Sequence, residues 1–346
     1  MRLKTFVAAA TLAVASLSSA CAMGGSQGGA MERSGLAIGT VCSIRILDGG
    51  SQRALDEAFA RLVAIEDVMS ANKDGTVVDA LNKAAGGAPI QVPADLMAVL
   101  QRSLLYAELS GGAFDPTIGP LVKLWDIGGD DERVPAPAEI GAALRLIDHR
   151  GLTLDTRAGT AALARPGMRI DLGAIAKGYA ADEVARILKD RGVKAAIVDL
   201  GGNIMAVGKK PDGTPWRIGV QDPFDQRGAY IGLASVPGGT TVVTSGIYER
   251  YFTGPAGEHY HHILDVTTGY PVVSDLVSVT IIASSSMDAD GLSTAAFALG
   301  LERGMALIES RKEVEAVFID SSRRVYLSSG AKAIFRLTDQ NFTLAN

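Results

Sequence analysis

Hydrophobic and polar positions change their period several times along the chain. Residues 41–47 alternate between apolar and polar side chains, as a strand with one exposed face does. Residues 56–70 place apolar side chains three and four positions apart, which predicts an amphipathic helix directly after that strand. The same patterns predict helices over 93–110, 135–147, 174–190 and 289–299, and strands over 195–200, 204–208, 216–221, 228–235, 240–244 and 277–282.

The order of these elements indicates the fold class. Several predicted strands follow one another with no helix between them, whereas a doubly wound parallel sheet needs strict alternation of strands and helices. No repeat of 20 to 50 residues suggests a solenoid. The pattern therefore predicts an α+β fold with mixed or antiparallel sheets and flanking helices.

The amino terminus is typical of an exported protein. Positive charge in residues 1–4 precedes an apolar stretch over 6–17 and a run of small residues, as in a secretory signal. That stretch is too short to span a bilayer as a helix. Residues 17–21 resemble a lipoprotein box, in which Cys21 would be lipidated; the alternative is cleavage near Ala22.

These features predict three parts of the chain. Residues 1–21 form the signal, residues 22–33 a Gly- and Ser-rich tether, and residues 34–346 the folded domain. We expect a periplasmic protein that is anchored to the inner membrane by lipidated Cys21 and has no other membrane contact.

Composition and charge narrow the function. Of the 346 residues, 47% are hydrophobic and 21% are charged, which is sufficient for a substantial core. The net charge of -5 and the lack of basic clusters argue against nucleic-acid binding. Since Cys21 is lipidated or removed, no intramolecular disulfide is possible, and Cys42 is expected to be a buried small side chain.

Two segments combine turns with charged side chains. In residues 111–125 a Gly-Gly helix stop precedes Ala-Phe-Asp-Pro-Thr, so that Asp115 can accept hydrogen bonds from nearby backbone amides. In residues 170–182 a strand enters a Gly turn that opens a helix. Backbone N–H groups there could face a phosphate, with Lys177 adding positive charge; otherwise Lys177 is a solvated helix residue. The spacing is not that of a Walker loop.

Two later segments offer a base and metal ligands. Residues 259–271 contain three of the four histidines, but His261 and His262 are adjacent and would face opposite sides of a strand, which suits one zinc ion poorly. If a helix begins near residue 289, Asp290 and Thr294 share a face and offer oxygen ligands to a hard cation. The alternative is an Asp near the N-cap with a solvated Thr.

These segments, together with residues 200–204 and 216–223, resemble the ApbE-type FAD:protein FMN transferase family, in the same order along the chain. The resemblance implies a single compact α+β domain that holds FAD in a cleft, with Mg²⁺ beside the pyrophosphate. It further implies transfer of FMN from FAD to a Thr or Ser hydroxyl of an exported protein, with release of AMP. Family analogy places that acceptor in a membrane redox complex.

The resemblance also assigns roles by position. The FAD site would comprise the flavin contacts Ile38 and Asn72, the nucleotide contacts Ala113, Phe114 and Asp115, the further contacts Asp171 and Lys177, and a main-chain contact at Leu264. The metal would be held by the Ala174 carbonyl, Asp290 and Thr294, with Ser293 where some relatives have a second Asp. His262 is the family-matched general base.

Asn72 departs from the family pattern, which has an aromatic residue at this position. A smaller polar side chain covers less of the flavin and could admit water. An FAD pyrophosphatase that yields FMN and AMP is therefore an alternative function. A non-catalytic flavin-binding lipoprotein is another alternative, and the presence of Lys177, His262, Asp290 and Thr294 argues against it.

Overall fold

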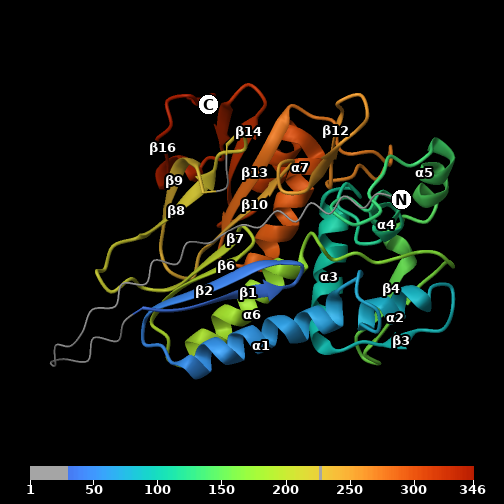
Figure 1. The fold of residues 1–346 in the computed structure, drawn as a ribbon, viewed down its shortest axis with the longest axis horizontal. Coiled ribbons are helices and arrows are strands. Elements are labelled where there is room, and N and C mark those ends of the chain that lie inside the picture. The colour runs from blue at the N-terminus through green and yellow to red at the C-terminus, as the bar shows by residue number, and fades with distance from the viewer. Residues whose placement is uncertain (1–29, 226–227) are drawn as a thin grey trace, which may run out of the picture.

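The computed structural model describes residues 30–225 and 228–346. A nine-stranded sheet runs through the molecule (Figure 1), and its neighbouring strands are antiparallel except for the last pair, which is parallel. In sheet order the strands are β1 (Met31–Ala37), β2 (Thr40–Asp48), β6 (Ala195–Leu200), β7 (Asn203–Gly208), β10 (Thr241–Gly246), β13 (Leu276–Ala283), β14 (Glu315–Asp320), β15 (Arg324–Leu327) and β17 (Thr343–Leu344).

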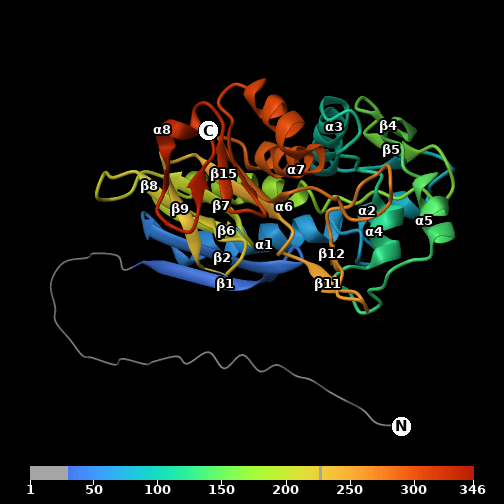
Figure 2. The ribbon, with the colours of Figure 1, turned by 90° about the horizontal axis from the view of Figure 1, so that it is seen from above.

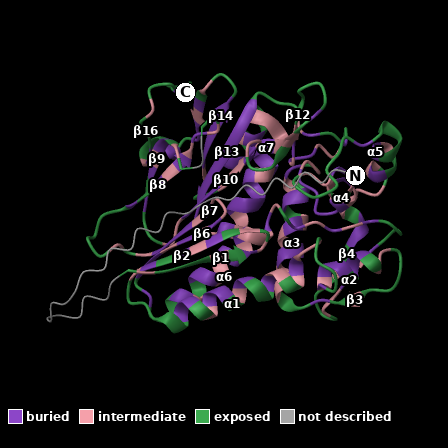
Figure 3. Cartoon of the chain, viewed as in Figure 1, coloured by how far each residue is buried: buried purple, intermediate pink, exposed green. Residues whose placement is uncertain are grey.

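Three helices cover one face of this sheet (Figure 2): α1 (Gln52–Met69), α6 (Ala176–Asp190) and α7 (Ser286–Glu309). Helix α1 is an example of how an apolar face packs a helix against the sheet. Ser51 caps its first turn by accepting a hydrogen bond from the N–H of Ala54, and Leu55 and Leu62 recur on its buried face. Figure 3 shows the resulting division into a buried and an exposed side. Helix α3 (Ala94–Leu109) packs beside α7.

The other face of the sheet carries a second, three-stranded sheet in the order β16 (Phe335–Leu337), β9 (Tyr230–Val236) and β8 (Trp216–Gln221). Trp216 and Val236 are buried between the two sheets. The short helix α8 (Ala331–Ile334) precedes β16. The main sheet is therefore covered on both faces, which explains why every residue of β13 is buried.

Short elements gather at one end of the sheet (Figure 1). They are α2 (Val77–Lys83), β3 (Ile90–Gln91), α4 (Gly119–Trp125), α5 (Pro137–Leu144), the 3-10 turn η1 (His149–Gly151), β4 (Leu152–Asp155), β5 (Thr160–Leu163) and the hairpin of β11 (Tyr251–Thr253) and β12 (His259–His261). Trp125 anchors this end. It is fully buried, and its Nε1 donates to the carbonyl of Gly269 at 2.8 Å.

The fold confirms the predicted α+β class with antiparallel sheets and flanking helices. Cys42 is buried, and burial raises the pKa of its thiol to about 11, so that it acts as a small apolar side chain. Within the described ranges, no helix is long and apolar enough to cross a membrane. The predicted signal, with Cys21 and Ala22, lies outside the described residues.

Three predicted boundaries were wrong. Strand β1 begins at Met31, inside the segment predicted as tether; as an edge strand with exposed polar side chains, it shows no clear alternation. Helix α5 is shorter than predicted. Helix α7 extends beyond 289–299 at both ends and has a kink at Gly300, whose φ of 78° interrupts the regular helix.

Candidate functional site

The close contact between α6 and α7 places Asp290 at the start of α6. A Cβ at Gly178 would lie 2.2 Å from the carbonyl oxygen of Ser286, so only glycine permits this approach. Asp182 of α6 accepts the N–H groups of Ser286 and Met287, which caps α7. As a result, Asp290 Oδ2 accepts the N–H of Gly178 at 2.9 Å.

Lys177 and Asp290 form the charged centre of this junction. The Lys177 Nζ lies 3.7 Å from Asp290 Oδ1 and donates to the carbonyl of Gly173 at 3.1 Å. The carboxylate is only 3% exposed. A buried carboxylate needs a partner, so Lys177 is an ion-pair residue here and not simply a solvated helix residue.

One turn later on α7, hydroxyl groups line the same helix face. Thr294 Oγ1 lies 3.2 Å from Ser245 Oγ, and Ser293 Oγ lies 2.8 Å from it. Ser293 Oγ also donates to the carbonyl of Asp290, and Ser293 is fully buried. The hydroxyl of Ser293 thus has its partners inside the protein. The alternative of an N-cap role for Asp290 was wrong, because Ser285 is the N-cap of α7.

The oxygen ligands predicted for a metal are of the chemical kinds that bind magnesium. Asp290 carries a carboxylate and Thr294 a hydroxyl one turn later on α7, and Ala174 lies in the turn before α6; carboxylate, hydroxyl and carbonyl oxygens are hard ligands of the kind that Mg²⁺ prefers. Among the described residues, no group of three or more His, Cys, Asp or Glu side chains could hold a metal. A site with a single carboxylate leaves ligand positions for phosphate oxygens and water.

The backbone amides before and within the first turn of α6 do not behave as predicted. The N–H of Gly173 donates to Asp171 Oδ1, that of Ala176 to the carbonyl of Leu172, and that of Gly178 to Asp290. The prediction that these amides face a phosphate was therefore wrong for these three groups. Positive charge for an anion at this place comes from side chains instead.

Asp171 connects this junction to the segment that contains Asp115. Its N–H donates to the carbonyl of Pro116 at 2.9 Å. Burial raises the pKa of the Asp171 carboxyl above its ordinary value. The N–H of Gly173 and the positive charges of Arg250, Arg169 and Lys177 oppose that shift. Three cationic side chains thus surround one carboxyl group in an otherwise acidic protein.

The side chains of Phe114 and Asp115 are used inside the protein. Asp115 Oδ1 accepts the N–H of Thr117 at 2.8 Å and its hydroxyl at 2.6 Å. Asp115 Oδ2 accepts the N–H of His149 and lies 3.1 Å from its Nδ1. The Phe114 ring is buried with its edge against Tyr106. Any contact between Ala113–Asp115 and a nucleotide would therefore use main-chain atoms.

His262 follows β12 and is held by one carbonyl oxygen. Its main-chain N–H donates to the carbonyl of Arg250 at 3.1 Å, and its ring Nδ1 lies 3.2 Å from the same oxygen. Because a carbonyl can only accept, Nδ1 carries the proton of the neutral ring and Nε2 keeps its lone pair. The pKa of His262 is lowered to about 4 by burial and by the positive charges of Arg250 and Lys177, and the hydrogen bond to the Arg250 carbonyl opposes this shift. The ring is thus a neutral base at pH 7.

His261 has the opposite tautomer. Its Nδ1 accepts the N–H of Ile263 at 3.3 Å, and its Nε2 donates to the carbonyl of Val272 at 3.1 Å. The ring is buried, and burial lowers its pKa to about 4. The adjacent histidines thus have different partners and opposite tautomers.

The remaining predicted positions are Ile38, Leu264 and Asn72, and none of them is hydrogen-bonded to Asp290, Lys177 or His262 in the described part of the chain. Ile38 is in the β1–β2 turn with a positive φ of 46°. Leu264 is buried in the small core around Trp125, and its main chain forms an antiparallel bridge with Pro271. Asn72 is exposed on the loop after α1. Within the described part of the chain, no hydrogen bond joins Asn72 to the other predicted site residues.

Sequence reasoning missed Arg250, Arg169 and His149. All three act through contacts between distant segments, so no local spacing indicates them. Nothing in the immediate sequence of Arg250 indicates that its side chain reaches Gly39.

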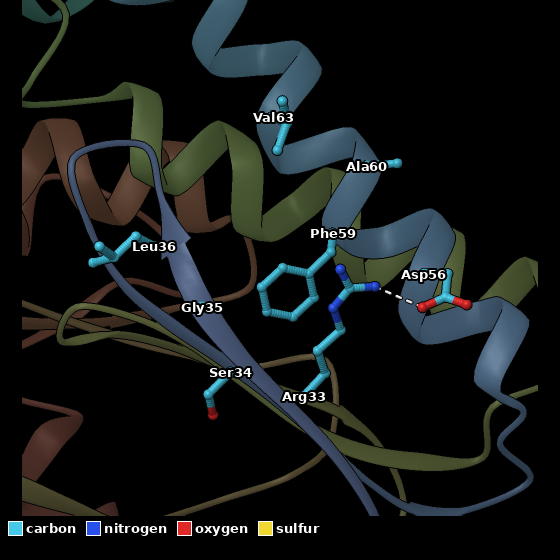
Figure 4. Close-up of a pocket in the computed structure, with 8 residues that line it drawn as sticks. All are labelled: Arg33, Ser34, Gly35, Leu36, Asp56, Phe59, Ala60 and Val63. Atoms are coloured by element: carbon cyan, nitrogen blue, oxygen red, sulfur yellow. Dashed lines mark hydrogen bonds and ion pairs between the residues drawn. The ribbon is translucent and has the colours of Figure 1, made fainter.

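Pockets on the described surface include two that can be compared with the candidate site. One of about 270 Å³ lies between β1 and α1 (Figure 4) and includes none of the predicted site residues. The other, of about 430 Å³, is lined by Pro120, Lys123, Leu124, Asp126, Asp131, Arg133 and Arg169. The lining of the second pocket includes Arg169, which lies two residues before Asp171 in the chain and whose charge lowers the pKa of Asp171.

Comparison with known proteins agrees with this geometry. A relative from Treponema pallidum, called FAD:protein FMN transferase, is 42% identical over 332 residues, which covers 90% of this chain and 91% of the relative. A relative of the same name from Klebsiella pneumoniae is 39% identical over 292 residues, which covers 83% of this chain and 90% of the relative.

Solved structures show the same fold. The flavin transferase ApbE from Vibrio cholerae superposes with a TM-score of 0.79 at 32% identity, covering 88% of this chain and 99% of that one. The ApbE protein from Thermotoga maritima superposes with a TM-score of 0.81 at 30% identity, covering 89% and 99%. The sequence profile of the ApbE family matches residues 38–318, and the chain belongs to the ApbE family.

Proposed function

We propose that this protein is a Mg²⁺-dependent FAD:protein FMN transferase that moves FMN from FAD to a Thr or Ser hydroxyl of an acceptor protein and releases AMP. The observation that carries the proposal is the junction of α6 and α7, where Asp290 meets Lys177, together with the neutral base His262. A junction of this kind suits an anionic substrate and a hydroxyl nucleophile.

Each residue has a distinct task in this mechanism. Asp290, Thr294 and the Ala174 carbonyl would hold the Mg²⁺, which when bound would neutralise charge on the FAD pyrophosphate. Lys177 adds a positive charge beside the same phosphates. His262 Nε2 accepts the proton of the acceptor hydroxyl as its oxygen attacks the phosphorus on the FMN side. The bond from that phosphorus to the bridging oxygen breaks, and AMP leaves with the electron pair.

The proposed setting follows from the amino terminus. The protein would be exported, periplasmic and attached to the inner membrane by a lipid on Cys21, with the tether allowing the domain to reach its acceptor. A subunit of a membrane redox complex is the proposed acceptor. The net charge of -5 supports partners other than nucleic acid.

Hydrolysis of FAD to FMN and AMP is the second candidate, and Asn72 favours it. This residue is exposed and polar where the family pattern has an aromatic ring. With less apolar cover over the flavin, water could take the place of the acceptor hydroxyl.

The substitution Asp290→Ala tests the proposed metal site. AMP release from FAD in the presence of Mg²⁺, measured with and without an acceptor, should be abolished because the only carboxylate of the proposed metal set is lost. Asp190→Ala is the matched control, since it removes an exposed carboxylate at the end of α6 whose ion pair with Arg186 contributes little. Undiminished AMP release in Asp290→Ala would refute the assignment.

A further inference from the structure

Arg250, which the mechanism above does not use, contacts two parts of the candidate site. Its guanidinium Nη2 donates to the carbonyl of Gly39 at 2.9 Å, across a separation of 211 residues in the chain. Its own main-chain carbonyl accepts the N–H of His262 and lies 3.2 Å from His262 Nδ1. One residue thus holds the tip of the β1–β2 hairpin with its side chain and the candidate base with its main chain.

The hairpin tip needs such a hold. Ile38 and Gly39 both have positive φ values, 46° and 68°. Gly39 adopts this conformation freely, whereas a β-branched residue such as Ile38 is strained there. A strained residue persists only where its surroundings fix it. The charge-assisted hydrogen bond from Arg250 to the Gly39 carbonyl supplies one such constraint at the end of an edge hairpin.

Arg250 also sets the charge around the base. Its guanidinium disfavours the imidazolium form and so lowers the pKa of His262, and it lowers the pKa of Asp171 as well. Among the described residues, Lys177 of α6 and His261 of β12 also lower the pKa of His262 through their charges. Removing the guanidinium would therefore raise the pKa of His262, while the main-chain carbonyl would still hold the ring.

We propose that Arg250 is a positioning residue of the FMN transfer reaction, which fixes the hairpin tip over the flavin and keeps it in register with the base. This inference rests on the proposed function, because the role of His262 as a base does. The side chain and the main chain of Arg250 have separate effects in this inference. The side chain governs FAD affinity and the pH range of the base, and the main chain governs the orientation of the ring.

The test compares Arg250→Gln and Arg250→Lys with the wild type in the presence of Mg²⁺. FAD affinity is measured without an acceptor, and KM, kcat and the pH profile are taken from AMP release. Arg45→Gln is the control, because Arg45 is exposed on β2. Thermal unfolding is measured for each variant to show that it is folded.

Arg250→Gln should weaken FAD binding and raise KM about tenfold, as loss of a charge-assisted hydrogen bond does. It should also move the acidic limb of the pH profile to higher pH and change kcat on the plateau less than KM. Arg250→Lys should weaken FAD binding but keep the wild-type acidic limb, because it keeps the charge. Arg45→Gln should match the wild type in both measurements.

The inference would be overturned if Arg250→Gln kept both the FAD affinity and the acidic limb of the pH profile of the wild type. Equal shifts of the acidic limb in Arg250→Gln and Arg250→Lys would also overturn it. If Arg250 had only a structural role, its substitution would lower the unfolding temperature and change neither the FAD affinity nor the acidic limb of the pH profile. A wild-type protein that binds FAD without ever releasing AMP would contradict the proposed function instead. In that case the FAD affinity of Arg250→Gln would still decide whether Arg250 holds the hairpin tip.

Discussion

Acid should destabilise the protein through His261, and His261→Gln isolates the effect. The wild-type ring accepts the N–H of Ile263 at Nδ1, so protonating that nitrogen would replace a hydrogen bond with two opposed N–H groups. This arrangement agrees with the direction in which burial moves the pKa, from 6.5 to about 4. Glutamine does not titrate, and its amide nitrogen can still donate to the carbonyl of Val272.

The size of the effect follows from the two pKa values. Well above pH 6.5 the ring is neutral in both the folded and the unfolded chain, and His261 adds no pH dependence. As the pH falls from 6.5 toward 4, the unfolded chain binds a proton that the folded protein refuses, so stability is lost. Between about pH 7 and about pH 5 this loss amounts to about 2 kcal/mol.

Urea unfolding at about pH 7 and about pH 5, followed by tryptophan fluorescence, gives the two free energies of unfolding for each protein. We expect the loss on acidification to be about 2 kcal/mol smaller in His261→Gln than in the wild type. Other titrating groups, such as His262 and Asp182, contribute to both proteins and cancel in the difference. Equal losses in the two proteins would refute the description of His261 as a buried neutral ring.

Three further outcomes are expected. Gly178→Ala should lower the free energy of unfolding in urea by about 1–3 kcal/mol, because its Cβ would lie 2.2 Å from a backbone oxygen. Gly141→Ala has open space in α5 and should raise the free energy of unfolding by about 0.5–1 kcal/mol. Equal effects of the two substitutions would contradict the close packing of α6 and α7. Asn72→Tyr should lower the ratio of AMP released without an acceptor to FMN transferred when an acceptor is present, both measured with the same enzyme samples. An unchanged ratio would show that Asn72 is not a cause of hydrolysis. Since His262 acts as a base only above its pKa of about 4, AMP release should be level around neutral pH and fall below about pH 5; an acidic limb centred near the ordinary histidine pKa would contradict its burial.

Local patterns predicted the parts of the fold that local physics determines. Strand β2 and helix α1 follow from apolar periodicity, and the shared face of Asp290 and Thr294 follows from the helical repeat. The different surroundings of His261 and His262 follow from the alternation of side chains along a strand. None of these inferences requires knowledge of distant contacts.

The parts that were missed depend on tertiary contacts. Strand β14 is a short apolar run, which periodicity alone does not distinguish from a helical segment. The need for glycine at Gly178 arises from the backbone of another helix. The buried roles of Phe114 and Asp115 depend on Tyr106 and His149, which no spacing in their own segment indicates.

The central claim concerns the fate of the FMN, and mass spectrometry of an acceptor protein tests it most directly. A candidate acceptor is incubated with FAD, Mg²⁺ and the enzyme, and its mass is compared with the amount of AMP released. We expect an FMN adduct on a Thr or Ser of the acceptor, in proportion to AMP, and neither product with Asp290→Ala. AMP release that leaves every acceptor unmodified would contradict transfer and identify the protein as an FAD pyrophosphatase.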